Sequence, residues 1–526
     1  MISSQGRQFL AQAGGALAIA VLIAGCGDNY RPVITPVPSN GPAAQVASYV
    51  VAVSTTGTGS DGVVSIIDYS GDSIMAEATI GPDPGAFTLD ASGNTGYTVN
   101  SDGTLSNFSI STTLQTKYVL RSTLSTSAQI VNLMPPYSGL WAADLNGNVV
   151  DLFNGVPEAF VKAIPVATPS SSPTMPVFIA GASTTYGQRQ YVINQNVADQ
   201  APTACNNPAN FGSVAAGAAT PVEIASDTAD PAIPVGKCPV YGIETPDLQR
   251  VFVLNRGDDT ITVINSRNNT LDACTPFQNQ NGQWITCHPS IPLPAGSGPL
   301  YAEYNAATDQ LVVANYDGGT ISVVNVALDA YGNDENTYAN GNCTTYAACG
   351  AITGGFGTVT TVKVGNTATP NPASVTVLYD GSKAYTANQN DDSGTGSGTV
   401  TVVNLSTYTV EKTITVVGHP RTVVNTQNSG YAKVYVNSPD QPYITIIQST
   451  PTVTDQVDTA LLLEGLPIDI RATTANGSGG TNANFSSRVP GYGQPCNLSA
   501  AQLQSYYGAG YLSGLTLAQC QLQQLP

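Results

Sequence analysis

The stretch VVANYDGGTISVVN, residues 312–325, carries the pattern that decides the fold of this chain. Two short runs, made mostly of Val, Ile, Ala and Thr and each ending in Asn, flank the turn residues Asp317, Gly318 and Gly319. β-Branched residues favour strands, while Asp and Gly favour tight turns. The stretch therefore predicts two adjacent antiparallel strands.

The same two strands recur throughout the chain. Copies of the first strand end 44 to 73 residues apart, at Ala52, Asn100, Asp144, Asn194, Asn255, Asn315, Asn388 and Asn437. Copies of the second strand are clearest at 63–68, 260–265, 320–325 and 399–404. A third strand follows, as at 408–416, and a fourth comes after a Gly/Pro turn, as at 299–304 and 372–377. Repeated units of four short strands are typical of β-propeller blades, so we expect an all-β fold.

The number of units predicts the number of blades. Eight units can be counted, so we expect a β-propeller of about eight four-stranded blades. Units two to four fit the pattern loosely, and seven blades is the alternative if one of them fails. A β-helix is the main rival architecture, but its rungs would be shorter and more regular.

These repeats resemble the YVTN-type, surface-layer family of β-propellers, whose repeat joins a Tyr-Val-x-Asn strand, a Thr-Val-Ser-Val-Ile-Asp strand and a Val-Gly-x-x-Pro turn. Residues 191–194, 260–265 and 417–420 carry the match, and the likeness covers about residues 47–475. The resemblance implies that the strand after the Gly/Pro turn is the innermost of its blade. The last such strand, 467–472, is then expected to complete the first blade and close the ring. The architecture serves binding proteins and enzymes alike, so the resemblance concerns fold rather than function.

The N-terminus resembles a bacterial lipoprotein signal peptide. Arg7 precedes a stretch from Phe9 to Ile23 without charged residues, and the sequence Leu22-Ile-Ala-Gly-Cys26 closes it. This run is too short for a transmembrane span. Its ending resembles the lipobox, which implies cleavage before Cys26 and acylation of that cysteine, for example with palmitate. An ordinary signal peptide that ends near a cysteine is the alternative.

Four segments are therefore expected along the chain. They are a lipoprotein signal peptide at 1–25, a lipidated Pro-rich tether at 26–46, the β-propeller at 47–475, and a Gly-rich linker with a disulfide-pinned α-helical tail at 476–526. In the tail, Ser499 and Thr516 are placed to cap two short helices.

Cysteine usage fits an exported protein. The chain has nine cysteines, and lipidation of Cys26 leaves Cys205, Cys238, Cys274, Cys287, Cys343, Cys349, Cys496 and Cys520. Four disulfides are then possible in an oxidising compartment, although eight cysteines allow 105 pairings. Sequential pairing is the simplest expectation, because each pair then closes one local loop. Zinc is the rival interpretation, but the chain lacks a C-x-x-C motif and has only two histidines, so we expect no metal site.

Composition and the absence of known motifs reduce the range of functions to consider. The net charge of −18 argues against electrostatic binding to nucleic acid or to an anionic membrane. The chain contains no P-loop, nucleophile elbow, dinucleotide fingerprint or haem-attachment motif, so we expect no cofactor and identify no catalytic residue.

Candidate ligand-binding residues lie in or beside the innermost strands. They are Glu244, Glu303, His419, Arg421, Asp469 and Arg471. Only 10% of the chain is charged, so the channel mouth where these strands begin, with several charges near one axis, is where a small ligand is expected if one binds. The alternative is that Asp469 and Arg471, or Arg421 and a neighbouring carboxylate, form ion pairs between blades.

The sequence predicts a lipid-anchored, non-catalytic binding or scaffold propeller at the bacterial cell envelope. Its partners would be the lipid bilayer, through acylated Cys26, and an unidentified envelope protein or small ligand. Gly27 rather than Asp follows Cys26, which favours the outer membrane, on its periplasmic side or at the cell surface. The alternative is a propeller enzyme, lactonase-like or cofactor-dependent dehydrogenase-like, with Glu244 and Glu303 converging at the central channel.

Overall fold

The computed structural model describes residues 49–473, apart from gaps at 91, 125–127, 136–138, 167–174, 182–188, 197–203, 246, 280, 330–331, 342, 393, 395, 428–431 and 450–454. The expected signal peptide, tether, linker and helical tail lie outside the described residues, as do Cys26, Cys496 and Cys520. The chain divides into the units Met1–Gln45 and Val46–Pro526, and all described residues belong to the second. Within the described part, no helix is long and apolar enough to cross a membrane.

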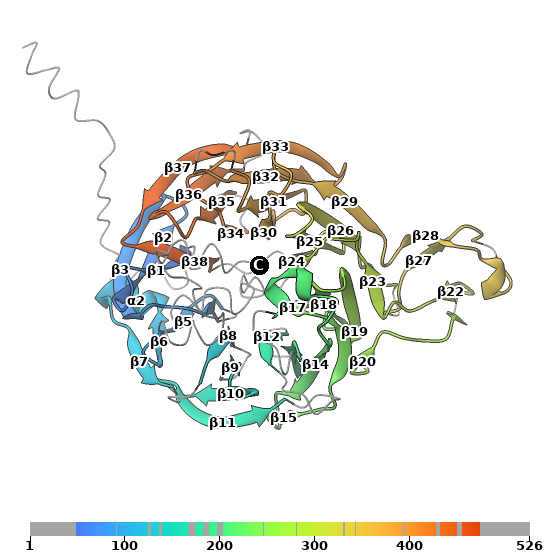
Figure 1. The fold of residues 1–526 in the computed structure, drawn as a ribbon, viewed down its shortest axis with the longest axis horizontal. Coiled ribbons are helices and arrows are strands. Elements are labelled where there is room, and N and C mark those ends of the chain that lie inside the picture. Colours follow the sequence, from blue (N-terminus) through green and yellow to red (C-terminus); the bar gives the residue numbers. More distant parts are fainter. Residues whose placement is uncertain are drawn as a thin grey trace, which may run out of the picture. The chain divides into compact units, whose positions relative to one another are not determined.

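The described strands form a ring of eight antiparallel sheets (Figure 1). The colours in Figure 1 pass once around the ring, so blades that are consecutive in sequence are neighbours in space. The predicted eight-bladed β-propeller is therefore confirmed, and the alternative of seven blades is wrong.

The strands of the first four blades run outward from the axis as follows. Blade 1 contains β38 (Leu466–Ala472), β1 (Tyr49–Thr55), β2 (Asp61–Asp68) and β3 (Ser73–Pro82). Blade 2 contains β4 (Phe87–Leu89), β5 (Thr95–Val99), β6 (Thr104–Ser109) and β7 (Leu120–Thr123), with the helix α2 (Ile110–Thr116) before β7. Blade 3 contains β8 (Ile130–Met134), β9 (Leu140–Asp144), β10 (Val149–Asn154) and β11 (Ala159–Pro165). Blade 4 contains β12 (Pro176–Ala180), β13 (Arg189–Asn194), β14 (Ala216–Glu223) and an outer strand divided into β15 (Thr228–Ala229) and β16 (Ile233–Lys237), with the 3₁₀ helices η1 (Ala204–Asn206) and η2 (Pro208–Asn210) before β14.

The other four blades follow the same plan. Blade 5 contains β17 (Pro239–Glu244), β18 (Arg250–Asn255), β19 (Thr260–Asn265) and an outer strand divided into β20 (Thr270–Leu271) and β23 (Ser290–Pro292). Blade 6 contains β24 (Pro299–Asn305), β25 (Gln310–Asn315), β26 (Thr320–Asn325) and β29 (Val359–Lys363). Blade 7 contains β30 (Pro372–Val377), β31 (Lys383–Asn388), β32 (Thr399–Asn404) and β33 (Thr409–Thr415). Blade 8 contains β34 (Thr422–Asn425), β35 (Lys433–Asn437), β36 (Tyr443–Gln448) and β37 (Gln456–Leu462).

The repeated Asn explains why the two sequence motifs occur together. Asn315 is buried at the end of β25, and its Nδ2 donates to Thr320 Oγ1 at 2.9 Å and to Ser322 Oγ at 2.8 Å on β26. The same pair of bonds joins Asn255 to Thr260 and Thr262, Asn388 to Thr399 and Thr401, and Asn100 to Thr104 and Ser106. In these four blades the Asn side chain therefore holds the hairpin at its turn by using hydroxyl groups at the start of the next strand.

The last strand closes the ring as predicted. β38 pairs antiparallel with β1, with Ala472 opposite Val50 and Asp469 opposite Val53. This pairing supplies the innermost strand of blade 1, whose other three strands come from the beginning of the propeller. Closure covers the edge of β1, which would otherwise be free to pair with another chain.

Two small sheets extend from blades 5 and 6 and are called the arm below. The arm spans 272–288 and 334–358 and contains β21 (Phe277–Gln278), β22 (Trp284–Ile285), β27 (Asn336–Tyr338), β28 (Ile352–Gly355) and the 3₁₀ helix η3 (Tyr346–Ala348). Disulfides Cys274–Cys287 and Cys343–Cys349 lie within it, and Cys205–Cys238 stabilises the loops before β14 and β17. All three bonds are the sequential pairs expected from the sequence. The arm projects beyond the ring, at the right of Figure 1.

Candidate functional site

The candidate residues stand at different positions along the innermost strands. Arg421 directly precedes β34, whereas Glu303 lies near the end of β24 and Glu244 ends β17. In blades 2 to 8 each inner strand is followed in the chain by its antiparallel partner, so these inner strands run in the same direction along the axis. The six residues therefore do not all lie where these strands begin, because Glu303 is the fifth residue of β24, Arg471 the sixth of β38 and Glu244 the last of β17.

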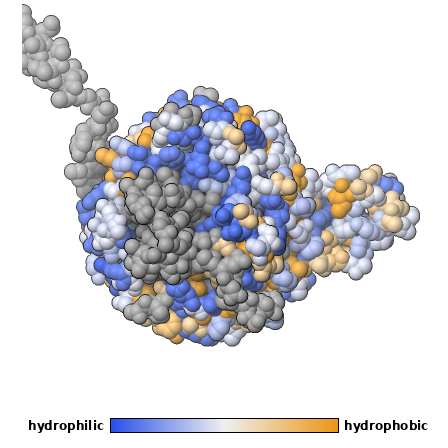
Figure 2. Space-filling view, in the orientation of Figure 1, coloured by the Kyte–Doolittle hydropathy of each residue, from blue (hydrophilic) through white to orange (hydrophobic). Residues whose placement is uncertain are grey.

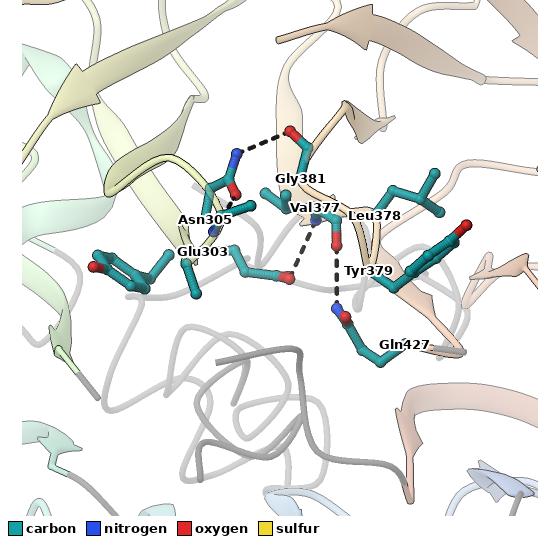
Figure 3. Close-up of a pocket in the computed structure, with 10 residues that line it drawn as sticks. Glu303, Asn305, Val377, Leu378, Tyr379, Gly381 and Gln427 are labelled. Carbon is teal, nitrogen blue, oxygen red and sulfur yellow. Dashed lines mark hydrogen bonds between the residues drawn. The ribbon is translucent and has the colours of Figure 1, made fainter. Parts of the chain in front are cut away.

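Glu303 lines a pocket of about 110 Å³ between blades 6 and 7 (Figure 3). The walls are the turn after β24 and the turn after β30, together with Gln427 beyond β34. Glu303 Oε1 accepts a hydrogen bond from Val377 N at 3.2 Å, and Gln427 Nε2 donates to Val377 O at 3.1 Å. Asn305 Nδ2 donates to Gly381 O at 3.0 Å and joins the two turns directly. The pocket is small, and polar and apolar groups line it in similar measure.

Burial changes the acidity of Glu303. The side chain is 7% exposed, and burial raises its pKa to about 8, although hydrogen bonds from Val377 and Thr376 act in the opposite direction. A carboxyl with this pKa is mostly protonated at neutral pH and can donate a hydrogen bond into the pocket. It could bind a carbonyl or hydroxyl group, or transfer a proton to one.

Glu244 does not join Glu303 in this pocket. It is buried at the end of β17, but it is absent from the residues that line the pocket. Its charge raises the pKa of Tyr191, which places it beside blade 4. Among the described residues, no group of three or more His, Cys, Asp and Glu side chains is arranged to hold a metal ion.

Asp469 and Arg471 form a buried ion pair. Arg471 Nη1 donates to Asp469 Oδ1 at 3.0 Å, and Nη2 lies 2.8 Å from Oδ2. Thr422 Oγ1 donates to the same carboxylate at 3.0 Å. Burial raises the pKa of Asp469 to about 6, and Arg471 and Arg421 oppose this rise. The pair lies within β38 rather than between blades, because residues two apart on a strand share one face.

Arg421 has no such partner. It is 1% exposed, and none of its three guanidinium nitrogens forms a hydrogen bond within the described part of the chain. Burial lowers the pKa of Arg421 to about 9, against the attraction of Asp469, which leaves it charged at neutral pH. The expected ion pair between Arg421 and a neighbouring carboxylate is therefore absent from the described residues.

His419 belongs to a turn rather than to the channel site. Its Nδ1 lies 2.7 Å from Asp440 Oδ2, its Nε2 lies 3.6 Å from Asp392, and its backbone N donates to Asp440 Oδ1 at 2.9 Å. The hydrogen bond with Asp440 raises the pKa of His419. Both ring nitrogens therefore face aspartates from neighbouring hairpin turns, so the imidazole connects those turns.

Two features of the inner strands and the arm were not foreseen. Phe178, Tyr241 and Tyr301 stack across blades 4, 5 and 6, with ring centroids 4.7 and 4.9 Å apart. A sequence signal for this stack exists, because each aromatic residue stands two positions after a Pro.

A buried ionic network at the base of the arm is the second feature. Arg250 Nη2 lies 3.3 Å from Asp272 and 3.2 Å from Asp334, whose Oδ2 contacts His288 Nδ1 at 2.6 Å. Burial and the charge of Asp334 raise the pKa of Asp272 to about 6, against the effect of Arg250. These residues are scattered in sequence, so no local pattern could have predicted the network.

Comparisons with known proteins agree on the architecture. No protein-family model and no curated protein matches the sequence. Among solved structures, dihydro-heme d1 dehydrogenase NirN in complex with DHE is similar over 85% of this chain and 79% of its own, at 11% identity and a TM-score of 0.54. AztD from Citrobacter koseri is similar over 80% of this chain and 96% of its own, at 11% identity and a TM-score of 0.48. The periplasmic gluconolactonase PpgL from Pseudomonas aeruginosa is similar over 81% of this chain and 99% of its own, at 14% identity and a TM-score of 0.45. At these identities the likeness shows the fold alone, and that fold is the β-propeller.

Proposed function

We propose that this protein is a lipid-anchored binding propeller of the bacterial cell envelope, and that its arm binds a protein partner. The observation that carries the proposal is the surface of the arm. Phe277 and Tyr346 are each 39% exposed, and Ile352 is 38% exposed. Exposed aromatic residues that gather on one projection are typical of protein interaction sites.

The arm also differs from the rest of the molecule in charge. Residues 273–287 and 336–358 contain no Asp, Glu, Lys or Arg, although the whole chain has a net charge of −18. Figure 2 shows hydrophobic residues among hydrophilic and intermediate ones on the visible face of the arm. Desolvating such a surface costs less than desolvating charges, so it favours a stable contact.

Two disulfides keep this surface ordered before a partner binds. Cys274–Cys287 and Cys343–Cys349 close short loops, and Tyr346 packs near both Trp284 and Tyr338, at 6.0 and 6.3 Å between ring centroids. Binding then loses less conformational entropy than it would with free loops. The same disulfides support an oxidising compartment outside the cytoplasm.

Site-specific photo-crosslinking in cells tests the arm. A photoreactive residue placed at Phe277 or Tyr346 should give one common adduct that disappears when Trp284 is changed to Ala. Phe160, which is 52% exposed on the outer strand of blade 3, is the matched control. Equal adducts from Phe160, or none from either arm position, would contradict the proposal.

Membrane attachment is tested separately through Cys26. Cys26→Ser should move the protein from the outer-membrane fraction to the soluble periplasmic fraction and abolish labelling by a palmitate analogue. Retention in the membrane fraction without labelling would show that another element anchors the chain.

The alternative enzyme function has one observation in its favour, the buried carboxyl of Glu303 that lines a pocket and whose pKa is raised by burial. A lactone-hydrolysis assay between pH 6 and pH 9, comparing the wild type with Glu303→Gln, distinguishes the two functions. We expect no activity that depends on Glu303. Hydrolysis by the wild type that E303Q loses would make the channel an active site and overturn the non-catalytic proposal.

A further inference from the structure

Arg421 is an isolated buried charge at the beginning of β34. A guanidinium carries five N–H donors, and in folded proteins buried donors almost always have acceptors. Here the side chain is 1% exposed, and Nε, Nη1 and Nη2 all lack an acceptor within the described residues. An uncompensated buried cation strongly disfavours folding, so its presence calls for a reason.

The other blades show that the fold itself does not need a cation at this position. Six inner strands start at or beside a Pro, and the residue after that Pro is buried in each of them. These residues are Val177, Val240, Leu300, Ala373, Arg421 and Ile468. Five of the six are apolar, so an aliphatic side chain satisfies the packing between blades. Blade 8 alone among these six replaces it with a charge.

Neighbouring carboxylates do not neutralise this charge. Asp469 is the carboxylate that attracts Arg421, but it is already held by Arg471 and by Thr422. Arg471 and Arg421 thus share one carboxylate. Arg256 near the same end is matched by Asp317, through two bonds of 2.9 and 2.7 Å. Arg421 therefore has no hydrogen-bonded carboxylate of its own among the described residues.

We propose that Arg421 binds the carboxylate or phosphate group of a small ligand at the end of the channel where the inner strands begin. The planar fork of the guanidinium matches two oxygens of such a group, and the pairing would satisfy both its charge and its donors. This site is distinct from the Glu303 pocket and from the arm. The proposal therefore does not depend on the function proposed for the arm.

Thermal unfolding of the full chain in the presence of simple anions tests the site. Sodium acetate and sodium phosphate are compared with sodium chloride at matched ionic strength. The wild-type Tm should rise with acetate or phosphate in a saturable way, by at least about 2 °C more than with chloride. Acetate probes the carboxylate and phosphate the phosphoryl group, so the better probe identifies the ligand class.

Arg421→Leu supplies the residue that blade 6 has at this position. In anion-poor buffer its Tm should equal or exceed that of the wild type, and its response to acetate and phosphate should fall to the response to chloride. Lys363→Met, at an exposed position, controls for the loss of one positive charge. Equal responses in the wild type and R421L, or no response beyond chloride in the wild type, would overturn the proposal.

A crystal structure of the wild type grown with the better probe gives a readout that does not require the variant to fold. Density for the anion within hydrogen-bond distance of Arg421 supports the site. Water alone around the guanidinium would overturn it.

Discussion

Glu303 shows how a single position can be buried and titratable at once. Its carboxyl lines a pocket, accepts a hydrogen bond from Val377 N, and has its pKa raised to about 8 by burial. The folded protein therefore favours the protonated carboxyl, whereas in the unfolded chain the carboxyl is mostly ionised at neutral pH. The stabilisation linked to this group is fully present below the ordinary pKa of 4.5 and is lost as the pH rises towards 8.

Glu303→Gln should remove this pH dependence. Gln keeps an acceptor for Val377 N and cannot ionise. The unfolding free energy of the wild type minus that of E303Q should fall by more than about 1 kcal/mol between pH 4.5 and pH 8. Urea denaturation at both pH values measures the difference, and Glu464→Gln, at an exposed position, is the control. A difference that stays constant with pH would contradict the raised pKa.

Asn315 is a second residue whose role can be isolated. Asn315→Ala leaves the hydroxyls of Thr320 and Ser322 without their common donor, which should cost about 1–3 kcal/mol of unfolding free energy. Asn390→Ala makes the same chemical change at an exposed position and should cost no more than about 0.5 kcal/mol. Equal losses in the two variants, measured by urea denaturation, would mean that the buried Asn does not hold the hairpin.

At the scale of elements, the repeat predicted the strands well because each hairpin is a local structure. The buried Asn, the hydroxyl residues after the turn and the Pro before the inner strand all lie within one unit of sequence. The three disulfides were predictable for the same reason, since their cysteines are separated by 33, 13 and 6 positions.

Positions along and between strands were harder to predict. Glu303 was correctly placed in an inner strand, but it is the fifth residue of β24, whereas Arg421 precedes β34. Strand membership alone does not say which end of the channel a side chain faces. Contacts such as Arg250 with Asp334, 84 positions apart, depend on how blades 5 and 6 pack, and this is not visible in local sequence.

The arm is an element whose order should depend on its disulfides. Changing Cys274 and Cys287 to Ser removes the bond that closes its first loop, a constraint typically worth about 2–4 kcal/mol. The loop contains no Lys or Arg, so chymotrypsin is the suitable protease, with Phe277 and Trp284 as sites. Cleavage there should become at least tenfold faster.

Mass spectrometry of the fragments locates the cuts. Phe160, which is exposed but held within β11, serves as an internal control and should be cut no faster in the variant. Equal cleavage of the loop in the wild type and the variant would show that the small sheets order the arm without the disulfide.

At the scale of the whole molecule, the pairing of β38 with β1 should decide whether the ring is stable. A chain that ends at residue 464 lacks β38 and leaves the edge of β1 exposed. It should self-associate and lose its cooperative thermal transition, whereas a chain that ends at residue 473 should keep both monomeric behaviour and the transition. Size-exclusion chromatography and circular dichroism compare the two, and identical Tm values would contradict a role for closure.

The closing contact also imposes an order of events on biosynthesis. Tyr49 and Thr473 are hydrogen-bonded although they are 424 positions apart. The first three strands, β1 to β3, can complete their sheet only after the segment that carries β38 has reached the same compartment. During this delay blade 1 is an incomplete sheet with an open edge. The newly exported chain therefore has to keep this edge from pairing with other chains until β38 arrives, which a propeller whose first blade is one continuous segment does not.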